Sequence, residues 1–256
     1  MTDLEIVAAG SSFVRPGGRD GWWQDDRTGR DVDDRVVSPF AFVSVAGSEA
    51  SDALDTLARK RPGMTPIMLG SPHEAGLLFE RMRPDRTEAW LAQAHTLDID
   101  GWVAARAFDV EARCIRDGIV WPRRGNWPDS VTPLGVLATP RDRVSGAYKP
   151  VVIIALLPGA GTEAAAHLRF GGWNDRPPPS VHVAFARLWL DQYGAVQVAN
   201  THDVVEFRVA RPVTTQAAAI ELARVQYHYC SDSVPDTLEA AAAELIGSTV
   251  WHFWWD

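Results

Sequence analysis

The residues that could carry acid–base chemistry gather in the last third of the chain. They are one histidine and three carboxylates, His182, Asp203, Glu206 and Asp232. A histidine beside a carboxylate is a common general acid–base pair, because the imidazole titrates near neutral pH. If these four side chains converge on one pocket, the sequence predicts a hydrolase-like enzyme.

Structural interpretations of the same residues stay open. Asp203 and Glu206 lie three positions apart across a turn-to-strand junction, so they need not face the same side of a sheet. His202 and Asp203 favour a turn, since aspartate often binds its own backbone there. Asp232 follows a helix end, where the helix dipole disfavours a carboxylate, and this predicts a specific partner such as an arginine.

The sequence lacks the usual catalytic and cofactor motifs. The segment "HDVVE" does not have the spacing of a helical zinc motif, and "LLPGAGTEAAA" (156–166) lacks the pattern of a phosphate or dinucleotide loop, although its helix start could hold an anion. A Gly-x-Ser-x-Gly elbow does not occur either. Cys114 and Cys230 are isolated, which favours two reduced thiols over a disulfide or a zinc site. We therefore expect no metal and no cofactor.

Composition narrows the class of protein. The 256 residues carry a formal net charge of -8, without a basic stripe, so we expect no nucleic-acid partner. The longest apolar run is too short to cross a bilayer, and the start lacks a signal peptide, so we expect no membrane association and a cytoplasmic protein. Nearly all cations are arginine, as in a GC-rich genome, so no single arginine stands out.

The first half predicts a loop followed by alternating strands and helices. Residues 15–35 have loop composition, and the Trp22–Trp23 pair either pins this loop to the body or lines a pocket. A strand at 39–47, a helix from an N-cap at Ser51 to Gly63, and a strand at 65–71 suggest a βαβ unit. Helical patterns follow at 72–82, 87–97 and 101–118, before an irregular stretch at 121–148.

The second half predicts a strand, a helix pair, a hairpin and two more helices. A buried strand at 149–159 precedes a short helix, and Ser180 is the expected N-cap of a helix that ends at Gly194. Two β-rich runs at 195–200 and 203–212 predict a hairpin. The last two helices are expected to start at Thr214 and at a capping box of Asp236 with Glu239.

The last residues, "GSTVWHFWWD", predict a final strand whose tryptophans fill the space between sheet and helices. An aromatic platform for a ligand is the alternative. The terminal Asp256 must then lie at the surface or be paired, because burying an unpaired charge is prohibitive. Core packing is expected for Tyr227. The candidates for ligand or partner contact are Trp173, Asn174, Tyr227, Trp254 and Asp256.

The C-terminal part resembles a bacterial family catalogued as domain of unknown function 4253. The resemblance is carried by "GGWNDRPPPSVHVAFARLWLDQYGA", "DVVEFRVARPVTTQAAAIELARVQYHYCSD" and "WHFWWD". Where members often have a cysteine, this chain has Arg176, so a metal or disulfide shared with Cys230 is not expected. The resemblance implies a fold and a bacterial origin, and it implies no activity.

Two functional hypotheses are consistent with the sequence. The first is a protein-binding, regulatory or immunity-type module without turnover, which fits the acidic charge and the exposed-looking tryptophans. The second is the hydrolase described above. For the fold we expect an α+β protein with a mixed sheet flanked by helices, a βαβ-containing N-terminal part and a β-α-ββ-α-α-β C-terminal part. We expect the segments 1–35 (loop-rich), 36–120 (α/β), 121–148 (connector) and 149–256 (α+β domain). The oligomeric state, and whether the two halves share one sheet, stay open.

Overall fold

A computed structural model describes residues 4–14, 35–117, 123–173, 175–233 and 237–256. The expected Trp22–Trp23 pair, Asn174 and Asp236 lie outside these ranges. The described strands are β1 (Ser12–Val14), β2 (Arg35–Val37), β3 (Ala41–Val45), β4 (Met64–Gly70), β5 (Val152–Pro158), β6 (Ala195–Asn200), β7 (Val204–Val209) and β8 (Val250–Trp254). The described α-helices are α1 (Ala50–Lys60), α2 (Pro72–Glu80), α3 (Thr87–Thr96), α4 (Ile99–Asp117), α5 (Ala164–His167), α6 (Pro179–Tyr193), α7 (Gln216–Tyr229) and α8 (Leu238–Leu245).

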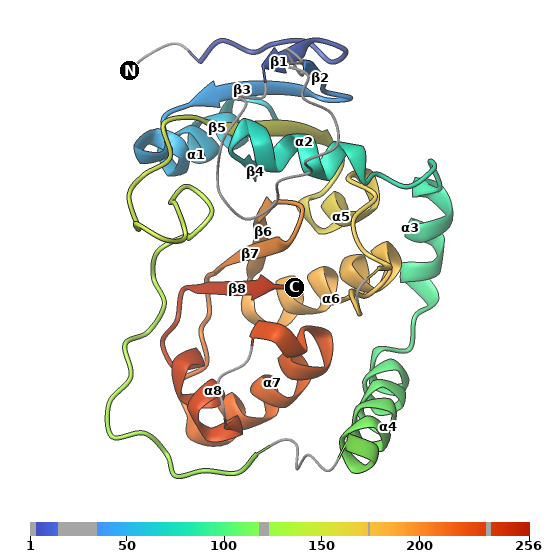
Figure 1. Cartoon of the computed structure of the whole chain (residues 1–256), viewed down its shortest axis with the longest axis vertical. Helices are drawn as coiled ribbons and strands as arrows, with labels where there is room; N and C mark the ends of the chain where they lie inside the picture. Colours follow the sequence, from blue (N-terminus) through green and yellow to red (C-terminus); the bar gives the residue numbers. More distant parts are fainter. Residues whose placement is uncertain (1–3, 15–34, 118–122, 174, 234–236) are drawn as a thin grey trace.

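A six-stranded mixed sheet joins both halves of the chain, in the order β3-β5-β4-β6-β7-β8 (Figure 1). The parallel contact is between β4 and β6, and the other neighbours are antiparallel. Strand β5 lies between β3 and β4, so the expected βαβ unit is split by a strand from the second half. The predicted α+β class with a mixed sheet is confirmed.

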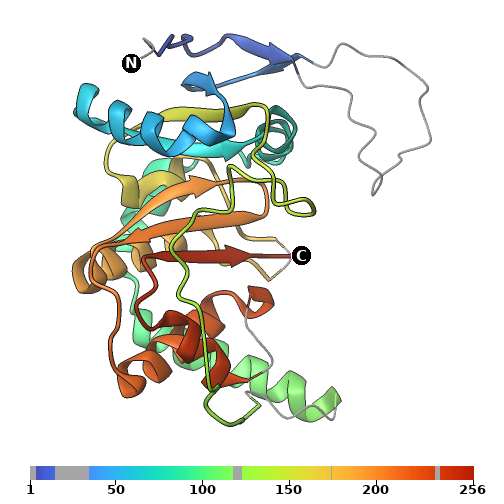
Figure 2. The same cartoon turned by 90° about the vertical axis from the view of Figure 1, so that its left-hand side faces the viewer.

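One face of the sheet packs against most of the helices, and the other face packs against α1. Strand β5 alternates between them: Ile153, Ala155 and Leu157 pack in one cluster with Phe185 of α6, and Ile154 and its neighbours on the other face pack with residues of α1. This explains why β5 reads as a continuous apolar run. Residues 123–151 run along the sheet and on to β5 (Figure 2).

Four helix starts differ from the sequence prediction, the last being α8, for which a capping box of Asp236 with Glu239 was expected. Ser51 lies inside α1, whose N-cap is Glu49. Ser180 lies inside α6, whose N-cap is Pro178, because Pro179 can occupy the first helical position without losing a hydrogen bond. The N-cap of α7 is Thr215 rather than Thr214, and Thr237 caps α8, where its side chain accepts from the backbone N–H of Ala240.

The small antiparallel pair β1–β2 was not expected from the sequence, which predicted a loop-rich start. Its strands have only three residues each, too few to give an alternating pattern. No helix in the described ranges is both long enough and apolar enough to cross a membrane.

Candidate functional site

The final strand completes the hydrophobic core. Strand β8 pairs antiparallel with β7, from Val204 opposite Trp254 to Arg208 opposite Val250. The side chains of Trp251, Phe253 and Trp255 are buried against the helices. The Phe253 ring stacks on Trp189 of α6, with centroids 5.3 Å apart. The expected core role is confirmed for Trp251, Phe253 and Trp255, whereas Trp254 is only partly buried and lies beside Asp203.

His182 lies inside this core. Its Nδ1 is 2.6 Å from the hydroxyl of Tyr229, and its ring meets Phe170 and Trp255 edge-on or tilted. Burial, with a smaller contribution from the charge of Arg176, lowers the pKa of His182 to about 3, although the Pro177 carbonyl opposes the shift. The imidazole is thus neutral at physiological pH and 2% exposed, which leaves it no access to a substrate.

Arg176 is a central residue that sequence reasoning missed. Its guanidinium donates to the carbonyl of His202 and, at 3.1 Å, to the carbonyl of Trp255. It also lies 3.6 Å from the centroid of the Trp173 ring, which the guanidinium of Arg81 contacts at 4.6 Å. Burial lowers its pKa to about 10, so it stays charged. The sequence singled out Arg176 only as the residue that stands where members of the resembled family often have a cysteine, and gave no signal for these contacts.

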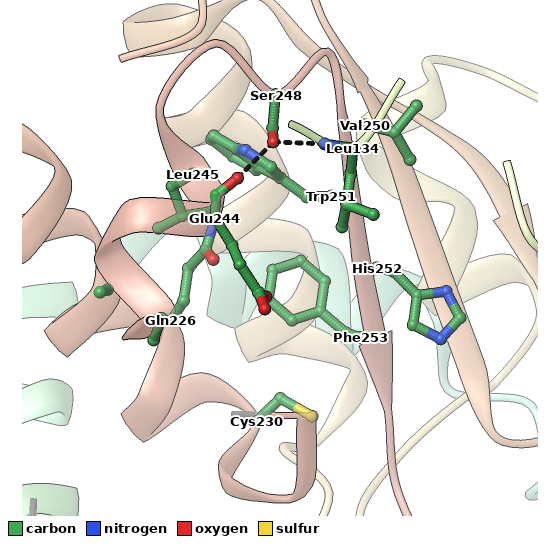
Figure 3. Close-up of a pocket in the computed structure, with 12 residues that line it drawn as sticks. Leu134, Gln226, Cys230, Glu244, Leu245, Ser248, Val250, Trp251, His252 and Phe253 are labelled. Carbon is green, nitrogen blue, oxygen red and sulfur yellow. Dashed lines mark hydrogen bonds between the residues drawn. The ribbon is translucent and has the colours of Figure 1, made fainter. Parts of the chain in front are cut away.

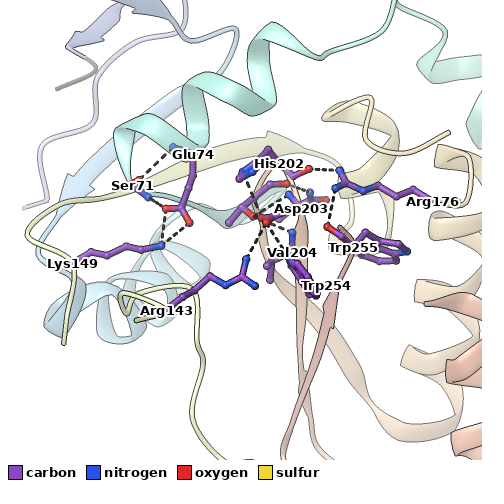
Figure 4. Close-up of polar contacts among 12 residues, drawn as sticks. Ser71, Glu74, Arg143, Lys149, Arg176, His202, Asp203, Val204, Trp254 and Trp255 are labelled. Atoms are coloured by element: carbon purple, nitrogen blue, oxygen red, sulfur yellow. Dashed lines mark hydrogen bonds and ion pairs between the residues drawn. The ribbon is translucent and has the colours of Figure 1, made fainter. Parts of the chain in front are cut away.

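Asp203 holds the turn between β6 and β7 to the final strand (Figure 4). Its carboxylate accepts from the Trp254 indole at 3.0 Å, from Arg143 at 3.1 Å and from the Thr201 hydroxyl at 2.9 Å. Arg143 also lies over the Trp254 ring, 4.7 Å from its centroid. The expected turn at His202 and Asp203 is confirmed. Close by, Lys149 pairs with Glu74 at 2.6 Å.

Glu206 lies on the opposite face of the sheet from His182. Its neighbours in β7, Val205 and Phe207, belong to the cluster that contains α6, so the pleat directs Glu206 to the other side. It accepts from the backbone N–H groups of Ala138 at 2.7 Å and Thr139 at 2.9 Å, and it contacts His252 Nδ1 at 3.2 Å. Burial alone would raise its pKa, but these hydrogen bonds and the adjacent histidine outweigh it and lower the pKa.

Asp232 and Cys230 form hydrogen bonds with the backbone of the last residues. Asp232 has a specific partner as predicted, but that partner is the backbone N–H of Asp256, at 3.1 Å, rather than an arginine. The Cys230 thiol donates to the carbonyl of Trp254 at 3.0 Å. Asp256 is exposed, and Tyr227 is buried as expected.

The candidate acid–base residues therefore do not share a pocket. Asp203 and Asp232 both bind residues 254–256, and His182 touches the Trp255 ring, whereas Glu206 lies behind the sheet. Most of these contacts join parts of the chain that are far apart in the sequence. Contacts of this kind stabilise the fold.

Helix α4 exposes large apolar side chains on its outer face. Helix α4 packs on α6 and α7 through residues such as Trp102, Val103 and Val110. On its other side Phe108 and Ile115 are each 72% exposed, seven positions apart and hence on one face. The exposed residues Ala104 and Ala112 extend this apolar stripe.

A groove of about 330 Å³ adjoins the stripe at Ala104, between α4, α6 and α7. Its apolar lining includes Val103, Leu188 and Val225, and Asp100 and Glu221 supply carboxylates. We call the stripe and this groove together the α4 surface.

Comparison with known proteins covers only part of the chain. Neither the curated proteins nor the solved structures gave a match to it. Residues 153–256, which run from β5 to the end of the chain, match the family model described as Domain of unknown function (DUF4253). The predicted resemblance is confirmed for residues 153–256, which are similar to this family.

Proposed function

We propose that the protein is a binding module of the bacterial cytoplasm, without turnover, that docks a basic protein partner on the α4 surface. The observation that carries the proposal is the apolar stripe of Phe108 and Ile115 on a helix that is covered on one side only. Large exposed apolar side chains that adjoin a groove are typical of protein interaction sites.

Charge indicates what kind of partner fits. The chain carries a net charge of -8, and the groove beside the stripe has carboxylates at Asp100 and Glu221. A partner that presents an apolar side chain flanked by lysine or arginine would complement both features and would be steered to the surface by charge. An immunity-type or regulatory protein that neutralises a basic partner fits this description.

The hydrolase alternative has less support. His182 is buried and neutral, and Glu206 lies on the other face of the sheet, already bound to two backbone N–H groups. Neither group is placed to exchange a proton with a substrate.

The test starts with crosslinking in cells of the source bacterium, where wild type is compared with Phe108→Asp. Val144→Asp is the matched control, because Val144 is 94% exposed but lies in the connector before β5. Each protein that only wild type and the control enrich is then purified, and its affinity is measured by calorimetry at low and high salt.

We expect a partner with a net positive charge that binds one to one, at least tenfold more weakly to Phe108→Asp and more weakly at high salt. Equal affinity for wild type and Phe108→Asp would overturn the proposal. So would a homodimer of this chain that Phe108→Asp dissociates, because the surface would then serve self-association.

A further inference from the structure

The six-stranded sheet has β3 at one edge and β8 at the other (Figure 1). An edge strand presents backbone groups with which a further strand can pair, and proteins usually cover them. At the β8 edge the Leu134 carbonyl accepts from the N–H groups of Thr249 and Val250, and the Ser248 hydroxyl accepts from the Leu134 N–H (Figure 3). At the β3 edge, within the described residues, the paired position is Val7 alone.

The N-terminal segment pairs with β3 at Val7 and continues no further along it. Val7 lies antiparallel to Phe42, and the two residues exchange both backbone hydrogen bonds, at 2.8 and 3.0 Å. Since the backbone groups of every second residue in a strand point to the same side, those of Ser44 also point away from β5. Ser44 is exposed, and no backbone hydrogen bond joins it to a described residue on this side. Its N–H and C=O are therefore available to an added strand.

A groove of about 570 Å³ runs beside this edge. Its volume is in the range of ligand-binding pockets, about 300–1,000 Å³. The end of β3, the first turns of α1 and the N-terminal segment all contribute to its lining, through residues that include Ser44, Val45, Ala53 and Leu4. It shares no lining residue with the groove of the α4 surface, so a role for it is independent of the proposed function.

The charge of the groove has one sign. Glu5, Glu49 and Asp52 line it, and all three are exposed. No lysine or arginine contributes to the lining in the described part of the chain. Three carboxylates without a cation among them favour a positively charged occupant, because complementary charge selects the partner and steers it to the site.

We propose that an extended segment of a partner protein, with lysine or arginine at every second position, binds in this groove as a strand antiparallel to β3. The residue opposite Ser44 would exchange both backbone hydrogen bonds with it. Val43 and Val45 direct their side chains to the α1 face of the sheet. The residues opposite them share that face, so basic side chains there lie toward Glu49 and Asp52. Backbone pairing then supplies affinity, and the alternate side chains supply specificity.

The probe is a capped peptide of five residues, in which threonine and lysine alternate and threonine occupies both ends. It is titrated into the full chain, and the backbone amide of Ser44 is followed by NMR. One comparison peptide has glutamate in place of lysine. Two others carry methyl groups on the backbone nitrogens of either the threonines or the lysines.

We expect the lysine peptide to shift the Ser44 amide, to bind at least tenfold more tightly than the glutamate peptide, and to weaken at high salt. In the antiparallel pairing the threonines lie opposite Ser44 and its outward-facing neighbours. Methylation of their nitrogens should therefore weaken binding at least tenfold. The lysine nitrogens point away from β3, so their methylation should change the affinity less than threefold.

The matched variants are Asp52→Asn, which removes a charge from the groove, and Asp191→Asn, which makes the same change at an exposed position of α6. Asp52→Asn should weaken the lysine peptide about fivefold, and Asp191→Asn should behave as wild type. Phe108→Asp should also bind the peptide as wild type does, which separates this groove from the α4 surface.

The proposal is overturned if the lysine peptide does not shift the Ser44 amide at millimolar concentration, or if the glutamate peptide binds equally well. It is also overturned if methylation of the threonine nitrogens leaves the affinity unchanged, because the peptide then does not pair with β3 in this way. Equal weakening by Asp52→Asn and Asp191→Asn would show that only the overall charge attracts the peptide, and this too would overturn it.

Discussion

The imidazole Nδ1 of His182 lies 2.6 Å from the hydroxyl oxygen of Tyr229, and both rings are buried. This contact joins α6 to the C-terminal end of α7 under the final strand. Removal of the hydroxyl would leave the imidazole nitrogen without its partner in a dry core.

We therefore expect Tyr229→Phe to lower the free energy of unfolding by about 1–3 kcal/mol. Urea denaturation measures the change. Tyr193→Phe is the control, because the Tyr193 hydroxyl has no hydrogen bond among the described residues, and its loss should cost less than about 0.5 kcal/mol. Equal effects of the two substitutions would contradict a structural role for the His182–Tyr229 contact.

The same histidine predicts an acid-dependent loss of stability. Its pKa is about 3 in the folded protein against an ordinary value of 6.5, so between these values the unfolded chain binds a proton that the folded chain does not. The stabilisation is complete above the unfolded pKa and is lost as the pH falls toward the folded one. Between about pH 6 and pH 4, wild type should lose up to about 1.4 kcal/mol per pH unit more than His182→Gln. The free energy of unfolding is measured by urea titration at each pH. If it falls equally with pH in wild type and in His182→Gln, the buried histidine is not the cause of the acid dependence.

Glu206 is expected to anchor the connector. Glu206→Gln replaces a carboxylate that accepts from Ala138 and Thr139, and it should cost about 2–4 kcal/mol. The connector would loosen first, so trypsin should cut faster after Arg141 and Arg143. The exposed Glu221→Gln, which breaks only a surface pair with Arg224, should change neither stability nor cleavage. Unchanged cleavage in Glu206→Gln would show that other contacts hold the segment.

Arg176 is expected to hold the last residues through its shape as well as its charge. A lysine keeps the charge but cannot reach the carbonyls of both His202 and Trp255 from a planar fork. Arg176→Lys should therefore cost about 2–3 kcal/mol and speed hydrogen exchange at Trp255. The control is Arg224→Lys, whose ion pair with Glu221 is exposed. If both variants show hydrogen exchange at Trp255 at the wild-type rate, the planar guanidinium of Arg176 does not hold the last residues in place.

Gln226→Met should make the protein more stable. The change removes a buried donor that lacks a partner, and methionine fills nearly the same space. The melting temperature should rise, in line with about 1 kcal/mol or more of recovered free energy. Calorimetry beside Gln216→Met, which makes the same change at an exposed position of α7, measures this. A lower melting temperature in Gln226→Met alone would mean that the packing of the glutamine side chain outweighs the cost of its unsatisfied amide.

The sequence predicts most elements of this fold because their signals are local. The hairpin of β6 and β7, the helix that ends at Gly194 and the final strand all have alternating or helical patterns bounded by turn residues. The helix starts were less well predicted, since several serines and threonines stand near each one. At α6 the proline at the first position decided the start instead of Ser180.

The site was harder to predict because its residues are defined by their surroundings. His182 has the chemistry of a catalytic residue, but its neighbours Tyr229 and Trp255 come from distant parts of the chain and enclose it. Gln226 and Trp251 show the reverse. Both are ordinary residues in the sequence, and only the packing of α7, α8 and β8 buries their donors without a hydrogen bond to a described residue.

The order of the strands has a consequence for how the protein folds. In the C-terminal part β6 and β7 form a hairpin, and β8 follows β7 after α7 and α8, so these strands pair across shorter stretches of chain than the other strands do. Val43 must instead find Ile154, and Met68 must find Ala199, across more than a hundred intervening residues. Such distant pairings slow folding. The strands β6 to β8 therefore make a natural nucleus, onto which β4, β5 and β3 assemble in the slow, rate-limiting steps.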